Sequence, residues 1–179
     1  GNINLAHQFS KHQSLSADVD FIHYNVKNPS HYEINNLDPG GNPESLYELR
    51  INKNTPIMAG VAKVDYVLDF GEKFKLENGV KITSMRFDND VRVDSLPAQS
   101  DWILLPELTS KFHLDEDVAG IYSTFSSKID AKTDFKAGIR YEHTNTNLGE
   151  EGQPDIIDRS YGSWFPSLFV SRKINESQS

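Results

Sequence analysis

The sequence predicts an all-β fold, an antiparallel up-and-down meander of about seven strands. Apolar and polar residues alternate with period two along most of the chain, whereas helical periodicity is scarce. The clearest case is residues 135–142, where Phe135, Ala137, Ile139 and Tyr141 alternate with polar or small residues. Ten Phe and seven Tyr residues, together with many β-branched side chains, also favour strands over helices.

The alternating segments give the expected strands in chain order. They run over residues 2–10, 13–25, 46–70, 74–88, 116–129, 132–145 and 163–174. Pro56 is expected to interrupt the third strand, because proline has no amide hydrogen to donate to a sheet. Residues 31–34 and 46–51 are expected to pair as a hairpin beyond the main sheet, and residues 102–108 to form a short helix or an apolar plug.

The connections between these strands are of two kinds that alternate along the chain. Short turns are expected at 11–12, 71–73, 130–132 and 175–176, and long loops rich in Asn, Pro, Gly or charge at 26–45, 88–114 and 145–162. Successive connections of an antiparallel meander lie at opposite ends of the sheet, so all short turns fall at one end. This asymmetry is typical of transmembrane β-barrels, and the chain is interpreted as a single segment, 1–179, of such a barrel.

Composition excludes several classes of protein. The chain has 179 residues, and its 18 Lys and Arg against 26 Asp and Glu give a net charge of −8, which argues against nucleic acid as a partner. With no cysteine, disulfides, thiol catalysis and cysteine-ligated metal centres are excluded. No run of 18 apolar residues is present, so no transmembrane helix is expected.

No catalytic, cofactor-binding or metal site is predicted, and the chain is not expected to be an enzyme. His23, His31 and His143 at the strand ends are more simply solvated than metal-bound. The acidic runs Asp88-Asn89-Asp90 with Asp94, and Asp115-Glu116-Asp117, lack the Gly and Glu of a calcium-binding loop. Ser163 lies outside any G-x-S-x-G motif.

The charged residues within the strands are expected to form the polar face of a barrel wall. They are Asp18, Asp20, Asp65, Asp69, Arg140 and Glu142. The opposite face, expected to meet lipid, includes Met58, Val64, Tyr66, Leu68, Ala137, Ile139 and Tyr141. Aromatic residues at the strand ends fit either an interfacial girdle or ordinary sheet packing; they are Tyr24, Phe87, Tyr141, Trp164 and Phe165.

Five short segments carry a resemblance to a known family. Asp65-Tyr66 precedes Leu76-Glu77-Asn78-Gly79-Val80-Lys81, residues 117–126 lead into 135–144, and residues 165–171 read FPSLFVS. In this order they resemble the TonB-dependent-receptor-like outer-membrane β-barrels of the Bacteroidetes, although Ile139 stands where that family often has Leu. The resemblance covers about residues 55–175 and implies outer-membrane localisation and uptake of a bulky nutrient by the complete protein.

The same resemblance implies three partners. They are outer-membrane lipid and, for the full-length protein, a plug domain and a TonB-type energiser. Seven strands is an odd number, whereas bacterial barrels have even numbers and plugged transporters about 22. The chain is therefore expected to be a barrel fragment that, in isolation, either closes on itself or self-associates through its apolar face.

The alternative function is that of a soluble lipocalin-like β-barrel that binds a small apolar ligand. The direction of the apolar face discriminates the two. In a lipocalin, Phe135, Ile139 and Tyr141 face inward, and in a membrane barrel they face outward, with Lys136, Arg140 and Glu142 on the inner face.

Overall fold

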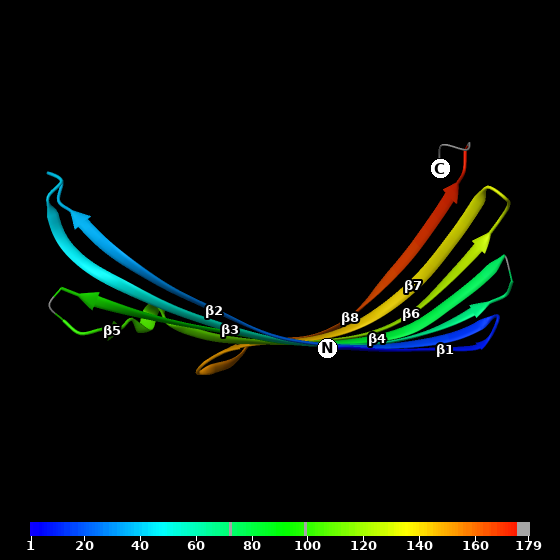
Figure 1. The fold of residues 1–179 in the computed structure, drawn as a ribbon, viewed down its shortest axis with the longest axis horizontal. Coiled ribbons are helices and arrows are strands. Elements are labelled where there is room, and N and C mark those ends of the chain that lie inside the picture. Colours follow the sequence, from blue (N-terminus) through cyan, green and yellow to red (C-terminus); the bar gives the residue numbers. More distant parts are fainter. Residues whose placement is uncertain (72, 99, 175–179) are drawn as a thin grey trace.

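The computed structural model describes residues 1–71, 73–98 and 100–174 and shows one long, curved antiparallel sheet (Figure 1). The elements are β1 (Asn2–Ser10), β2 (Gln13–Leu37), β3 (Pro43–Asp69), β4 (Phe74–Pro97), β5 (Ile103–Leu104), the 3₁₀ helix η1 (Pro106–Leu108), β6 (Ser110–Lys128), β7 (Thr133–Glu150) and β8 (Gln153–Arg172). The predicted all-β meander is confirmed. No helix of the described residues is long and apolar enough to span a bilayer.

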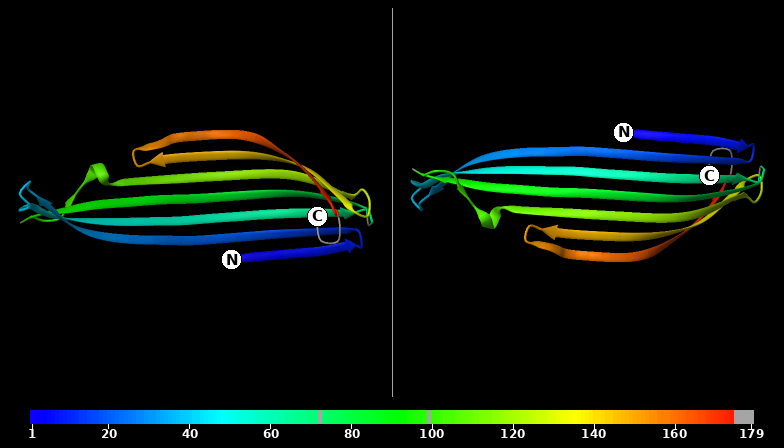
Figure 2. Two further views of the ribbon diagram at one scale, coloured as in Figure 1. Left: turned by 90° about the horizontal axis from the view of Figure 1, so that it is seen from above. Right: turned by 90° about the horizontal axis from the view of Figure 1, so that it is seen from below.

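The strands lie side by side in the order β1-β2-β3-β4-β6-β7-β8, and the short β5 pairs with the far end of β4 (Figure 2). Every pair is antiparallel. Within the described residues β1 and β8 form the two edges of the sheet and do not pair with each other. The segment therefore does not close on itself in this structure.

The long loops expected at 26–45, 88–114 and 145–162 are mostly strand, so these boundaries are corrected. β2 and β3 remain paired as far as Leu37 and Pro43, and β7 and β8 as far as Glu150 and Gln153. Pro29 suggested a loop, but it lies where β2 has no neighbour except β3, and proline is tolerated in such an edge strand. The connections themselves shrink to residues 38–42, 98–109 and 151–152.

Several local predictions are confirmed or corrected by the register. Residues 31–34 do pair with 47–50, and the segment 102–108 does contain a short helix, η1. Pro56 does not break β3, but the pairing of β3 with β4 is interrupted at Thr55 and Pro56. There the hydroxyl of Thr55 donates instead to the side-chain oxygen of Asn89 at 3.3 Å.

The two kinds of connection lie at opposite ends of the sheet, as the antiparallel order requires. The turns near Lys11, Gly71 and Ala131 lie at one end, and the connections 38–42, 98–109 and 151–152 at the other. Gly41 and Gly152 have φ values of 81° and 90° at the far end, a conformation that favours glycine. The turn expected at 175–176 lies outside the described residues.

One face of the sheet is apolar over a band about nine residues high. Residues directly opposite one another on neighbouring strands share a face. One transverse row reads Leu5, Ala17, Val64, Val80, Ile121, Tyr141 and Trp164. The band extends over 62–69 of β3 with the adjoining Phe70, over 74–82 of β4 and over 135–143 of β7, which matches the 9–11 residues of a tilted membrane-spanning strand.

The apolar face is also the more exposed of the two. Along β4, Val80 and Ile82 are 46% and 57% exposed, whereas the intervening Lys81 and Thr83 are half-buried. Side chains on the outside of a curved sheet splay apart, and those on the inside converge. Ile139 and Tyr141 thus lie on the outer face and Arg140 on the inner face, the arrangement expected of a membrane barrel and opposite to that of a lipocalin.

Beyond the band the apolar residues change faces. A row across six strands, continuous in register and on the inner face, contains Tyr24, Ile57, Phe87, Leu114, Leu148 and Ile157. The expected aromatic girdle is therefore only partly right. Tyr141 and Trp164 lie together on the outer face, with ring centroids 4.8 Å apart, but Tyr24, Phe87 and Phe165 lie on the inner face.

Candidate functional site

The inner face at the height of the band carries a cluster of paired polar side chains, named here the lumen cluster: Lys63, Asp65, Tyr122, Arg140 and Glu142. Lys63 Nζ lies 2.6 Å from Asp65 Oδ2, and the Tyr122 hydroxyl donates to the other carboxylate oxygen of Asp65. The guanidinium of Arg140 pairs with Glu142 and lies 5.7 Å from the centre of the Tyr122 ring. The cluster thereby links β3, β6 and β7.

A glycine in β4 makes the contact between Tyr122 and Asp65 possible. Asp65, Gly79 and Tyr122 lie in one transverse row of the sheet, so the tyrosine must cross β4 to reach the aspartate. A Cβ atom on Gly79 would lie only 2.3 Å from the Tyr122 ring. Gly79 is buried beneath that ring, which explains a glycine in the interior of a long strand.

A second group of charges lies on the same face nearer the short turns. The carboxylate of Glu77 is shared by Lys75 at 2.9 Å and Lys136 at 3.8 Å. Lys75 and Glu77 lie two residues apart in β4, and Lys136 comes from β7. The pair of Glu77 and Lys136 spans β6, which lies between β4 and β7 in the sheet.

All six charged residues expected on the polar face do lie on one face. Asp65, Arg140 and Glu142 belong to the lumen cluster, and Asp69 lies opposite Lys75. Asp18 and Asp20 accept hydrogen bonds from Asn4 and Asn2 of β1, the latter at 2.6 Å. The carboxylates of Asp18, Asp20, Asp65 and Glu142 are thus held by asparagine, lysine, tyrosine or arginine partners, an arrangement typical of a wetted channel wall.

Tyr122 and Gly79 belong to the resembling segments, but neither was predicted from the sequence to take part in a site. The available signal was a glycine inside an otherwise regular alternating strand, which indicates close approach by a neighbouring group. The identity of that neighbour depends on the strand register, which the sequence alone does not supply.

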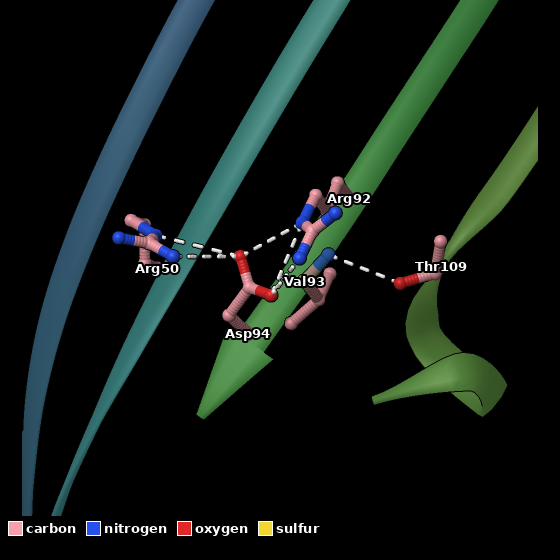
Figure 3. A network of polar contacts seen from close by, with 5 residues as sticks. All are labelled: Arg50, Arg92, Val93, Asp94 and Thr109. Carbon is pink, nitrogen blue, oxygen red and sulfur yellow. Dashed lines mark hydrogen bonds and ion pairs between the residues drawn. The ribbon is translucent and has the colours of Figure 1, made fainter. Parts of the chain in front are cut away.

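A third polar network lies on the outer face of the far half of the sheet. Asp94 is 1% exposed and lies between two arginines (Figure 3). Arg92 Nη2 donates to Oδ1 at 2.9 Å and Arg50 Nη2 to Oδ2 at 3.1 Å. Trp102, in the connection between β4 and β6, covers the Arg50 guanidinium. The centre of the Trp102 ring lies 4.4 Å from Arg50 Cζ.

Backbone contacts fix the same connection to β4. The amide of Val93 donates to the Thr109 hydroxyl at 3.1 Å, and the amide of Leu105 donates to the Val93 carbonyl at 2.9 Å. Figure 3 shows Thr109 beside Val93. The network of Asp94 therefore acts as a structural clamp that orders the end of β4 and the chain that follows it.

This clamp is expected to weaken in strong acid. The hydrogen bonds from Arg92, followed by those from Arg50, lower the pKa of Asp94 below its ordinary value of 3.8 despite the opposing effect of burial. A carboxylate with a lowered pKa stabilises the fold above pH 3.8, and this contribution is lost as the pH falls through the lower folded-state pKa.

The fluorescence of Trp102 reports this transition in a Trp164→Phe background. We expect a change with a midpoint below pH 3.8, and Asp94→Asn should remove that step from the titration. A midpoint above pH 3.8, or a step unaffected by Asp94→Asn, would contradict the assignment.

The residues weighed as metal ligands are dispersed. No group of three or more His, Asp or Glu side chains in the described ranges is arranged to hold a metal ion. His31 of β2 pairs with Glu48 at 2.9 Å, and His143 of β7 contacts Ser160 at 3.3 Å. Three strands lie between β2 and β7, so these two histidines are far apart. Of the acidic runs, Asp115 pairs with Arg86, and Asp94 is occupied by its arginines.

Comparison with known families agrees with this geometry. A family model described as "Outer membrane protein beta-barrel family" matches residues 7–179. No curated protein matches the chain. The matched range contains all of β2 to β8, with the lumen cluster and the part of the apolar band on those strands. The chain belongs to the outer membrane protein β-barrel family, and its place is the outer membrane.

Proposed function

We propose that the chain forms part of the wall of a wide, TonB-dependent-receptor-like barrel through which the complete protein takes up a bulky nutrient, and that it carries no catalytic group. The observation that carries this proposal is the pairing of an apolar outer band with a charged inner face on a sheet that stays open. Seven strands follow one another across the sheet, yet its two edges remain apart.

Barrel width supports the proposal because diameter grows with strand number. Eight strands suffice to close a barrel whose interior is filled by its own side chains. Here the seven consecutive strands would nearly complete such a barrel, but β1 and β8 lie at opposite edges of the sheet (Figure 2). A wider barrel has room for water or for a plug against the charged inner face.

The sequence resemblance supports the transport role. The segments 117–126, 135–144 and 165–171 resemble strands of TonB-dependent-receptor-like barrels. In the structure all three contribute to the membrane-crossing parts of β6, β7 and β8. A plug domain and a TonB-type energiser are accordingly proposed as partners in the complete protein.

Conductance of the complete protein in a planar bilayer tests the proposal, with KCl as the probe. A plugged wide barrel should be closed in plain buffer, conduct when urea loosens the plug, and close again when the urea is washed out. A channel open without urea would indicate a simple porin, and no conductance under either condition would indicate a narrow, filled barrel. Either result would overturn the proposal.

The proposed orientation places the short turns in the periplasm and the far connections outside the cell. None of these 179 residues is a cysteine, so a single introduced cysteine has no competing thiol in this part of the barrel. Cysteine at Ser100 or Glu151 should react with a membrane-impermeant thiol reagent on whole cells. Cysteine at Ala131, which like Ser100 and Glu151 is exposed in the structure, should react only after the outer membrane is opened. The reverse pattern would contradict the orientation.

A further inference from the structure

The charges of the chain are divided unequally between the two ends of the sheet. The short turns and their flanking residues, 10–13, 70–74, 128–133 and 172–174, are named here the turn rim. The rim contains six of the 18 Lys and Arg residues but two of the 26 Asp and Glu. The connections at the other end, 38–42, 98–109 and 151–152, contain four acidic residues and no Lys or Arg.

We infer that the turn rim binds the phosphate groups of phospholipids in the leaflet that surrounds the short turns. In the proposed orientation this is the periplasmic leaflet. The rim cations are Lys11, Lys73, Lys128, Lys132, Arg172 and Lys173. Lys and Arg side chains close to an anionic membrane surface are attracted to it.

The depth of the rim relative to the apolar band supports a lipid partner. Lys73 directly precedes Phe74, and Lys132 lies three residues before Phe135. Phe74 and Phe135 lie in one transverse row, at the edge of the apolar band nearest the short turns. Phe9 and Phe70, 56% and 63% exposed, lie at the same edge. At about 3.3 Å per residue, the cations lie within roughly 10 Å of the edge, at headgroup depth.

The rim cations are available to an external partner. All six are exposed. In the described parts of the chain, none of them has a carboxylate oxygen within 4.0 Å, whereas Lys63, Lys75 and Lys136 on the inner face are ion-paired. The carboxylate of Asp130 accepts from the Lys132 amide at 2.7 Å and from the Thr133 hydroxyl at 3.1 Å within its own turn, and of the six cations it is the charge of Arg172 that acts on it.

The distribution of the cations favours a membrane over a soluble acidic protein. They recur at or beside every short turn, from the β1–β2 turn to the β3–β4 and β6–β7 turns, and at the end of β8. They therefore extend across the whole end of the sheet that carries the short turns, as the surface of a surrounding bilayer would, and do not gather into one compact patch. The excess of positive charge is unchanged when Asp69, Lys75, Asp134 and Lys136 are added to the rim.

The test compares lipid preference in nanodiscs that hold the complete protein. Spin-labelled phosphatidylglycerol and phosphatidylcholine serve as probes, and their relative association with the protein is measured. The rim variant carries Lys73→Gln, Lys132→Gln and Lys173→Gln. A matched control carries Lys27→Gln, Lys53→Gln and Lys111→Gln, three exposed lysines in the far half of the sheet.

We expect the native protein to prefer phosphatidylglycerol at low salt, and the rim variant to lose about tenfold or more of that preference. The matched control should keep the preference for phosphatidylglycerol. Raised salt should abolish this preference in the native protein and in the control. Equal preference in the rim variant and the native protein, or loss in the control alone, would overturn the inference. Because lipid preference is independent of pore opening, failure here is distinguishable from failure of the conductance test.

Discussion

Replacing Ser123 with lysine is expected to lower the free energy of unfolding of the complete protein in lipid by about 2–4 kcal/mol. Ser123 lies on the outer face of β6, between Asn78 and Ile139, near the middle of the apolar band. A lysine there would place an ammonium group close to the centre of the bilayer. Urea unfolding in vesicles, followed by tryptophan fluorescence, measures the change.

The adjacent Thr124 supplies the matched control, because it carries a similar hydroxyl on the opposite face. Thr124 lies between Glu77 and Gly138 on the inner face. Thr124→Lys is expected to change the free energy of unfolding by less than about 1 kcal/mol, since the ammonium group would remain in a polar environment. If the two variants were equally destabilised, or Thr124→Lys the more so, the assignment of the two faces would be wrong.

Gly79→Ala is expected to reduce the free energy of unfolding by about 1–3 kcal/mol, the usual effect of overpacking a close contact. The new Cβ would lie 2.3 Å from the ring of Tyr122, so the ring must move. Its hydrogen bond to Asp65 across β4 would then be lost. Chemical denaturation of the variant in lipid gives the size of the effect.

Gly60→Ala is the control for backbone effects. Gly60 also lies inside a long strand, but a Cβ at that position has nothing within 4 Å. Removing a glycine there should be neutral, or stabilising by up to about 1 kcal/mol. In a Tyr122→Ala background the penalty of Gly79→Ala should largely disappear. Persistence of the full penalty without the Tyr122 ring would show that the glycine serves another purpose.

The sequence predicted the parts of the fold that depend on local alternation. The strict period of two in 135–142 correctly placed Ile139 and Tyr141 on one face and Arg140 on the other. The same alternation, applied to Met58 to Leu68, identified the apolar side of β3. These predictions succeed because a strand has only two faces, so one buried or charged residue fixes its neighbours.

The lengths of the far strands were not predictable from composition. Pro29 and the Asn residues around it indicate a loop by local preference, but an edge strand tolerates proline. The lumen cluster was only half predictable for a related reason. The charged residues were visible in the sequence, whereas the reach of Tyr122 over Gly79 depends on a register between β4 and β6 that no local pattern encodes.

The most direct test of the central claim is an accessibility scan of β6 in lipid, with spin labels at each position from 118 to 125 of the complete protein. If the sheet crosses the bilayer with its apolar face outward, labels at 119, 121, 123 and 125 should collide with dissolved oxygen, which concentrates in lipid. Labels at 118, 120, 122 and 124 should respond instead to a water-soluble nickel complex. Alternation in the opposite phase, or none, would contradict a lipid-facing apolar band and a wetted inner face.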